Sequence, residues 1–210
     1  MNYQIELEKI LLKEGKQGKK VLLHSCCAPC SSYVLTYLRQ YFQVTVFYFN
    51  PNITAETEYR KRVEEQKRLI AALNEEKDGY IISCMEGDYE PKQFMDAVKG
   101  YEDCPEGGER CKICFGQRLE ATAKLAKQEG FDYFATTLTV SPLKNASLLN
   151  ELGLVYADKY DVAYLVSDFK KKDGYKQSIE LSRKYDLYRQ DYCGCAFSKA
   201  ERERQKEQNL

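Results

Sequence analysis

The chain has little of several things that often reveal a function. Its 210 residues contain no tryptophan, one histidine (His24) and no net charge, because 32 acidic residues balance 32 basic ones. A single histidine excludes a His-rich metal site, and zero net charge removes any global electrostatic argument for nucleic acid, leaving only a local basic patch. With no tryptophan, stacking on a base would fall to the 17 tyrosines, most of which we expect to be packing residues. No apolar run approaches the about 20 residues that cross a bilayer, which excludes a spanning helix.

Cysteine, in contrast, is plentiful, with nine residues in the chain. Six of them form three close pairs: Cys26 and Cys27, Cys111 and Cys114, Cys193 and Cys195. The first nine residues carry charge and lack the apolar stretch of a secretory signal, so we expect a cytoplasmic protein. A chain of this length also buries a core without disulfide staples. We therefore interpret the paired thiols as metal ligands or redox groups and not as a framework of structural disulfides.

Apolar, β-rich runs alternate with longer segments of helical period, which predicts an α/β fold with a parallel sheet between helices. Strands are expected at residues 20–24, 43–49, 80–83 and 131–136, and residues 162–166 form either a fifth strand or a buried loop. Helices are expected at residues 31–40, 54–74 (with Thr54 as N-cap), 90–98, 111–128, 141–152 and 178–185, and the charged tail after Ser198 is helix-prone. We divide the chain into an N-terminal helical extension, 1–17, and a single catalytic domain, 18–210, with a cysteine-bearing C-terminal segment.

In such parallel sheets, ligands bind beyond the carboxyl ends of the strands. The first cysteine pair, together with Asn50 and Thr136-Thr137, falls at expected strand ends. The turn from Ser25 to Cys30 opens a helix, but it carries thiols where nucleotide-binding relatives of this architecture carry glycine or serine. A helix N-terminus lowers thiol pKa values, which favours metal ligation or nucleophilic reactivity.

Cys111-Lys112-Ile113-Cys114 lies at an expected helix start, and its spacing lets both sulfurs face one metal. Alone, this motif does not distinguish zinc, an iron–sulfur cluster and thioredoxin-type chemistry. Together with Cys26 and Cys27 it makes four thiolates, the usual number for a [4Fe–4S] cluster.

Cys193-Gly194-Cys195 has one residue between its thiols, so a disulfide there would close a small, strained and easily reduced ring. We interpret it as a redox-active pair, with ligation of a second metal or an inert core position as the alternatives. Cys30 is either a ligand or a packing residue. Cys84 is expected in the core. Cys104 is expected either to support the ligands from outside or to be incidental to the site, and not to be a ligand itself.

Asp168 precedes Phe169 and three lysines, residues 170–172. Such a charge run is either a solvated loop or a phosphate contact, with Asp168 as a proton donor or a metal-facing carboxylate. Basic residues at 189 and 199–202 could extend a basic strip around the third cysteine pair.

Three segments, residues 23–31, 105–115 and 188–195, closely resemble the cobalamin-independent epoxyqueuosine reductases of the QueH family. Thr136-Thr137-Leu138, Asp168-Phe169-Lys170 and Gly174-Tyr175 match the same pattern in order. The resemblance extends from about residue 18 to residue 198.

The resemblance implies a fold similar to the adenine nucleotide α-hydrolase group, and reductive removal of the epoxide oxygen from epoxyqueuosine in the tRNA anticodon, the last step to queuosine. It implies that a [4Fe–4S] cluster is held by Cys26, Cys27, Cys111 and Cys114. Cys193 and Cys195 would be the redox-active pair, and Asp168 would lie near an additional iron ion. The implied partners are tRNA carrying epoxyqueuosine and an external electron donor such as a ferredoxin or flavodoxin.

Two other functions fit the same residues less well. An adenylating tRNA-thiolation enzyme would need a Ser/Gly-rich phosphate loop after the first strand, which the turn at residues 25–29 does not supply. A zinc-stabilised RNA-binding module could use the same four thiolates.

Overall fold

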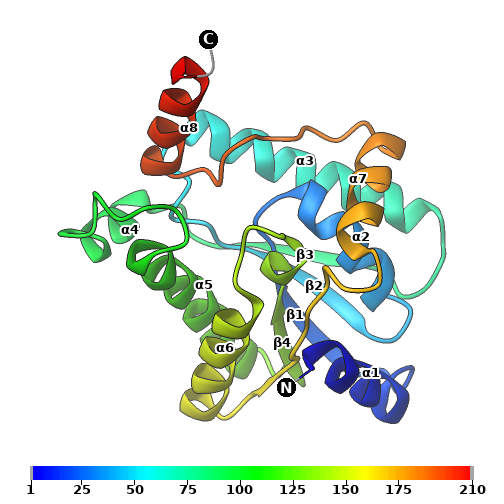
Figure 1. Cartoon of the computed structure of the whole chain (residues 1–210). Helices are drawn as coiled ribbons and strands as arrows, with labels where there is room; N and C mark the ends of the chain where they lie inside the picture. The colour runs from blue at the N-terminus through cyan, green and yellow to red at the C-terminus, as the bar shows by residue number, and fades with distance from the viewer. Residues whose placement is uncertain (1, 209–210) are drawn as a thin grey trace.

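A computed structural model describes residues 2–208. Residue 1 of the predicted N-terminal extension and residues 209–210 of the predicted catalytic domain lie outside this range. Helices and strands alternate along most of this length (Figure 1). The elements are α1 (Tyr3–Glu14), β1 (Lys20–His24), α2 (Ala28–Leu38), β2 (Gln43–Tyr48), α3 (Glu56–Glu75), β3 (Ser83–Glu86), α4 (Pro91–Ala97), α5 (Glu109–Gln128), β4 (Tyr133–Thr136), η1 (Thr137–Val140), α6 (Ala146–Tyr160), β5 (Ala163–Tyr164), α7 (Gly174–Lys184) and α8 (Ala196–Gln208). Within residues 2–208, no helix is both long and apolar enough to cross a membrane.

The five strands form one parallel sheet in the order β3-β2-β1-β4-β5. This confirms the predicted α/β fold with a parallel sheet between helices. The chain leaves β1 for β2 and β3 on one side and then returns to β4 on the other side. The carboxyl ends of β1 and β4 therefore flank the point at which the strand order reverses, where open parallel sheets bind their ligands.

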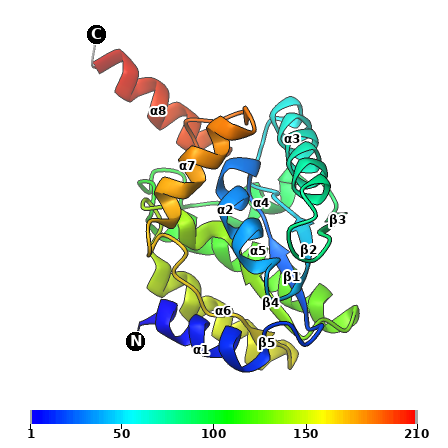
Figure 2. The same ribbon diagram turned by 90° about the vertical axis from the view of Figure 1, so that its right-hand side faces the viewer.

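Alternate side chains of each strand enter opposite halves of the core. Val21 and Leu23 of β1 pack with α1, α2, α3 and α7, whereas Leu22 packs with α5 and α6. Figures 1 and 2 show these two helical layers on either side of the sheet. Leu7 and Leu11 of α1 are buried in the first layer, so this helix packs on the same core.

Several predicted boundaries are wrong; for example, α6 continues to Tyr160 and not 152, and α7 begins at Gly174 and not 178. Three other boundaries can be traced to particular contacts. The third strand begins at Ser83 and not near Tyr80, because the Asn74 side chain binds both the N–H and the carbonyl of Ile82 at 2.9 Å and delays pairing with β2. Helix α3 begins at Glu56 without a side-chain cap, and the N–H of Thr54 instead binds the Gly194 carbonyl at 3.2 Å. Helix α6 begins five residues late, where the Asn145 side chain caps it.

The segment between α7 and α8, residues 185–195, has neither helix nor strand and runs along α3 (Figure 1). Side chains of α3 bind its backbone: Arg68 donates to the carbonyls of Tyr185 and Asp186, and Glu65 accepts from the N–H of Tyr188. These bonds satisfy backbone N–H and C=O groups that have no partner in a helix or a sheet. From there α8 projects from the end of the molecule opposite α1 (Figures 1 and 2).

Candidate active site

A pocket of about 480 Å³ lies beyond the carboxyl ends of β1 and β4, and seven of the nine cysteines line it. They are Cys26, Cys27, Cys30, Cys111, Cys114, Cys193 and Cys195. The structure thus brings together all three predicted cysteine pairs from three distant parts of the chain. All nine cysteines lie within the described residues and are free thiols.

The strand-end cysteines (Cys26, Cys27 and Cys30) occupy the turn from β1 into α2. Cys27 is the N-cap of α2 with an extended backbone, and Pro29 is pre-organised for the first helical turn. Neighbouring side chains fix this turn, since Asn50 donates to the Ser25 carbonyl at 2.8 Å and Tyr48 donates to the Cys26 carbonyl at 3.3 Å.

The strand-end sulfurs all lie within 4.8 Å of one another, close enough to share a metal ion. The Cys26 and Cys27 sulfurs are 3.7 Å apart, and the hydroxyl of Thr137 lies 3.9 Å from the Cys26 sulfur. Hydrogen bonds with Cys27 and Cys30 hold the pKa of the Cys26 thiol well below its ordinary value. The contact with Cys26 raises the pKa of Cys27 to about 11, because adjacent thiolates disfavour each other. The neighbouring thiols are thus the largest cause of both shifts.

Cys111 and Cys114 lie in the first turns of α5 and face the same pocket. The N–H of Gly107 donates to the Cys111 sulfur at 3.2 Å. Burial raises the pKa of Cys114 to about 11. Arg118 of the same helix also lines the pocket; it is 3% exposed and donates to the Cys114 carbonyl at 3.2 Å.

The C-terminal cysteine turn (Cys193-Gly194-Cys195) packs beside Cys114 in a small apolar cluster that also contains Phe94 and Phe197. The Cys193 and Cys195 sulfurs are 3.5 Å apart, which is a contact between two thiols and longer than the about 2.05 Å of a disulfide bond. The hydrogen bond with Cys195 lowers the pKa of Cys193 to about 6, and the same contact raises the pKa of Cys195. One thiolate beside one thiol is the form in which a dithiol exchanges most readily.

His24 is a buried residue at the end of β1. Its ring is fully buried, and Nδ1 lies 2.9 Å from the Thr136 hydroxyl, which ties the ends of β1 and β4 together. Burial lowers the pKa of His24 to about 3, so the ring is neutral.

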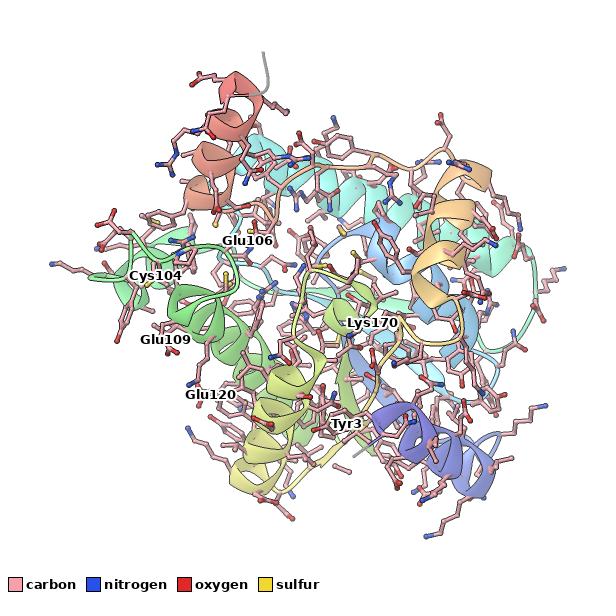
Figure 3. The ribbon with its side chains drawn as sticks, in the orientation of Figure 1. Tyr3, Cys104, Glu106, Glu109, Glu120 and Lys170 are labelled. Atoms are coloured by element: carbon pink, nitrogen blue, oxygen red, sulfur yellow. The ribbon has the colours of Figure 1, made fainter. Side chains whose placement is uncertain are left out.

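Asp168 pairs with Lys170, its Oδ1 lying 3.0 Å from the Lys170 ammonium. Figure 3 labels both Lys170 and Glu106, and of these two only Glu106 lines the pocket. Among the described residues, the lining of the pocket includes neither Asp168 nor Cys84 and Cys104. The expectation of a core position for Cys84 is wrong, because β3 is an edge strand and Cys84 is exposed on it.

The family of the chain follows from comparison with known proteins. The family model described as epoxyqueuosine reductase QueH matches residues 21–201, most of the chain and all three cysteine pairs. This chain belongs to the QueH family. It is therefore an oxidoreductase, as the resemblance of its cysteine motifs implied.

Individual QueH proteins agree with this assignment. The epoxyqueuosine reductase QueH of Staphylococcus epidermidis is 46% identical over 202 residues, covering 94% of this chain and 84% of the relative. The protein of the same name from Streptococcus pyogenes is 41% identical over 203 residues, covering 94% and 79%. That of Thermotoga maritima is 36% identical over 185 residues, covering 87% and 91%.

Sequence reasoning missed the arginines of this QueH pocket. Arg62, Arg110 and Arg118 line it and are each 3% exposed or less. The signal for Arg62 was present, because it lies with Gln66 on the apolar stripe of α3, where a polar residue needs a buried partner. Nothing comparable marks Arg110, whose guanidinium binds the loop carbonyls of Glu102 and Cys104.

Proposed function

We propose that this chain reduces epoxyqueuosine in the tRNA anticodon to queuosine, removing the epoxide oxygen as water. The proposal is supported chiefly by the meeting of three cysteine pairs in one pocket of a QueH protein. The enzyme would act in the cytoplasm on tRNA carrying epoxyqueuosine and would be reduced by an external donor such as a ferredoxin or flavodoxin. The catalytic domain would comprise residues 18–210, with residues 1–17 as an extension.

The donors around the pocket fit a thiolate-bound iron–sulfur centre. Cys26, Cys27, Cys111 and Cys114 would hold a [4Fe–4S] cluster, and soft thiolates are the ligands that such clusters take. The cluster would supply one-electron redox chemistry next to the substrate. Cys30 adds a fifth thiol within 4.8 Å of Cys26 and Cys27, so the site has a donor to spare for an additional iron ion. Asp168 is proposed as a further catalytic residue, although it is not part of the pocket lining. Asp168→Asn should lower turnover, and unchanged turnover would exclude that role.

The C-terminal cysteine turn would carry the net chemistry. Removing an epoxide oxygen to leave an alkene consumes two electrons and two protons and releases one water. Oxidation of two thiols to one disulfide releases two electrons and two protons. The epoxide and the Cys193–Cys195 dithiol would therefore react to give an alkene, one water and a disulfide. The external donor would then reduce the disulfide to the dithiol before the next turnover.

Cationic side chains would hold the nucleotide over these thiols. Lys144, Arg189 and Arg202 line the pocket alongside the buried arginines. Burial works to lower the pKa of Lys144, but the sulfurs of Cys26, Cys30 and Cys193 outweigh it and raise that pKa. Lys144 therefore stays charged and available to a phosphate.

Anaerobic purification tests the proposal, followed by iron and acid-labile sulfide analysis and incubation with epoxyqueuosine-containing tRNA and a reductant. About four iron and four sulfide per chain are expected, with queuosine formed. Cys193→Ser and Cys195→Ser should abolish turnover and keep the cluster absorbance, and Cys84→Ser is the matched control outside the pocket. Zinc without sulfide, and unchanged tRNA, would favour the zinc-stabilised module. Loss of cluster absorbance in Cys193→Ser would make that thiol a ligand.

A further inference from the structure

The side chain of Arg62 is a buried cation aimed at the backbone of the C-terminal cysteine turn. It is 1% exposed and donates through Nε to Glu58 Oε1 at 2.7 Å. Its two remaining nitrogens donate to the carbonyls of Cys193 at 3.2 Å and Tyr192 at 3.4 Å. The guanidinium also lies over the Tyr192 ring, 5.3 Å from its centroid.

Further contacts hold the same turn from the loop after β2. The N–H of Thr54 donates to the Gly194 carbonyl at 3.2 Å, and the Asn52 amide reaches the Cys193 carbonyl at 3.5 Å. Gly194 has a φ of +114°, and a Cβ there would lie 2.8 Å from Ile53 Cγ1. The turn is thus closely packed against Arg62 and Ile53, although no helix or strand includes it.

Glu58 fixes the arginine in turn. Its carboxylate also accepts the Tyr188 hydroxyl at 3.1 Å, five residues before Cys193. A planar guanidinium that binds a carboxylate on one edge presents its other nitrogens in a fixed direction, which a lysine ammonium cannot do.

We propose that Arg62, oriented by Glu58, is a positioning residue that clamps the backbone of Tyr192 and Cys193 and so holds the Cys193 and Cys195 thiols at the pocket. The inference depends on the proposed function, in which these two thiols are the redox pair. A misplacement of about 1 Å at a reacting group costs up to about a hundredfold in rate, so the clamp acts on the chemical step.

The test is Arg62→Lys, which keeps the charge and the Glu58 pair but cannot bind two carbonyls together. The expected result is a fall in kcat of about tenfold or more with KM for the tRNA changed by less than about twofold. Iron content should match the unmodified enzyme, and backbone hydrogen exchange at residues 192–195 should be faster. Arg60→Lys is the matched control, since Arg60 lies on the same helix, is about half exposed and pairs with Glu86 at 2.8 Å.

Three results would overturn the inference: an unchanged kcat, a raised KM with kcat intact (which would make Arg62 a substrate contact), or loss of iron. If Arg62→Lys does not fold, Glu58→Gln removes the orienting carboxylate and keeps the arginine, and the same split between kcat and KM is expected. Cys193→Ser separates this inference from the proposed function. If Cys193→Ser remains active, the proposed redox pair is wrong. If it is inactive and Arg62→Lys has normal kcat, only the clamp is wrong.

Discussion

The strand-end cysteines and the C-terminal cysteine turn reach the same pocket by different physical means. Cys26 and Cys27 follow directly from the central strand β1, so the sheet places them. Cys193 and Cys195 follow a segment without regular structure, and side chains of α3 place them. One helix serves both, because Gln66 binds the strand-end turn and Arg62, one turn earlier, binds the C-terminal turn.

This difference suits the two groups of cysteines to different functions, metal binding for the first and dithiol redox chemistry for the second. A metal centre needs donors with fixed geometry, which a buried strand end provides. A dithiol that opens and closes needs only rotation of its two side chains, which the clamped backbone of the C-terminal cysteine turn does not oppose. Substitutions in the two regions should therefore have separable effects.

The largest difference in iron content is expected between Cys27→Ser and Cys195→Ser. Cys27→Ser should lower bound iron and activity together by at least about tenfold, because it would remove one of the four thiolates proposed to hold the cluster. Cys195→Ser should abolish activity and keep the iron. Iron analysis and a queuosine assay on the same samples measure both. Equal iron loss in both variants would erase the distinction.

Gly194→Ala should disrupt the C-terminal turn alone. Its φ of +114° and the 2.8 Å approach of a Cβ to Ile53 predict a loss of about 1–3 kcal/mol in the free energy of unfolding, with kcat reduced and iron retained. Gly100→Ala is the control, since Gly100 has a φ of +86° with no atom within 4 Å of the added Cβ. Anaerobic thermal unfolding compares them, and equal losses would show that backbone strain, not packing, is the cause.

Gln66→Leu should disrupt the strand-end turn. The Gln66 carbonyl oxygen accepts the hydroxyls of Ser25 at 2.7 Å and Ser31 at 2.8 Å. Leucine leaves the Ser25 hydroxyl buried without this acceptor, which costs about 1–3 kcal/mol. Bound iron should fall in this variant, whereas in Arg62→Lys it should not. A full complement of iron in Gln66→Leu would contradict the expectation that this turn supports the metal centre.

Cys195→Ala should raise the pKa of Cys193 from about 6 toward the ordinary thiol value, because it removes the hydrogen bond that is the main stabiliser of the Cys193 thiolate. At pH 7 the fraction of Cys193 thiolate should then fall. The alkylation rate of the Cys193 peptide, followed by mass spectrometry across pH, should show its midpoint shifted to higher pH. An unchanged midpoint would assign the low pKa to the Ser198 hydroxyl and the backbone instead.

The smallest effect is expected from Cys84→Ser. Cys84 is exposed on the edge strand β3, away from both regions, and exposed substitutions change stability by about 0.5 kcal/mol or less. Iron content and turnover should equal those of the unmodified chain. A measurable loss of iron would show that this thiol takes part in assembling the centre.

Local sequence pattern was sufficient to predict the sheet and the position of the pocket. The alternation of apolar runs predicted the parallel sheet, and the position of Cys26 at the end of the first strand predicted where the pocket would be. Two boundaries depend on contacts that hydrophobic periodicity does not reveal: the Asn74 side chain binds the backbone of Ile82 just before β3, and the Thr54 N–H binds the Gly194 carbonyl just before α3. The exposed position of Cys84 was also missed, because strand order and not local sequence decides which strand is an edge.

By itself, the sequence determined the fold class, the family and the thiols available for chemistry, since these depend on periodicity and on motifs a few residues long. Only the tertiary structure decided that Cys30 joins Cys26 and Cys27, that buried arginines surround the thiols, and that Arg62 holds the C-terminal turn. The physical reason is that hydrogen bonds from one side chain to a backbone 130 residues away leave no periodic trace in either segment. Such bonds form only when the sheet has brought the two segments together.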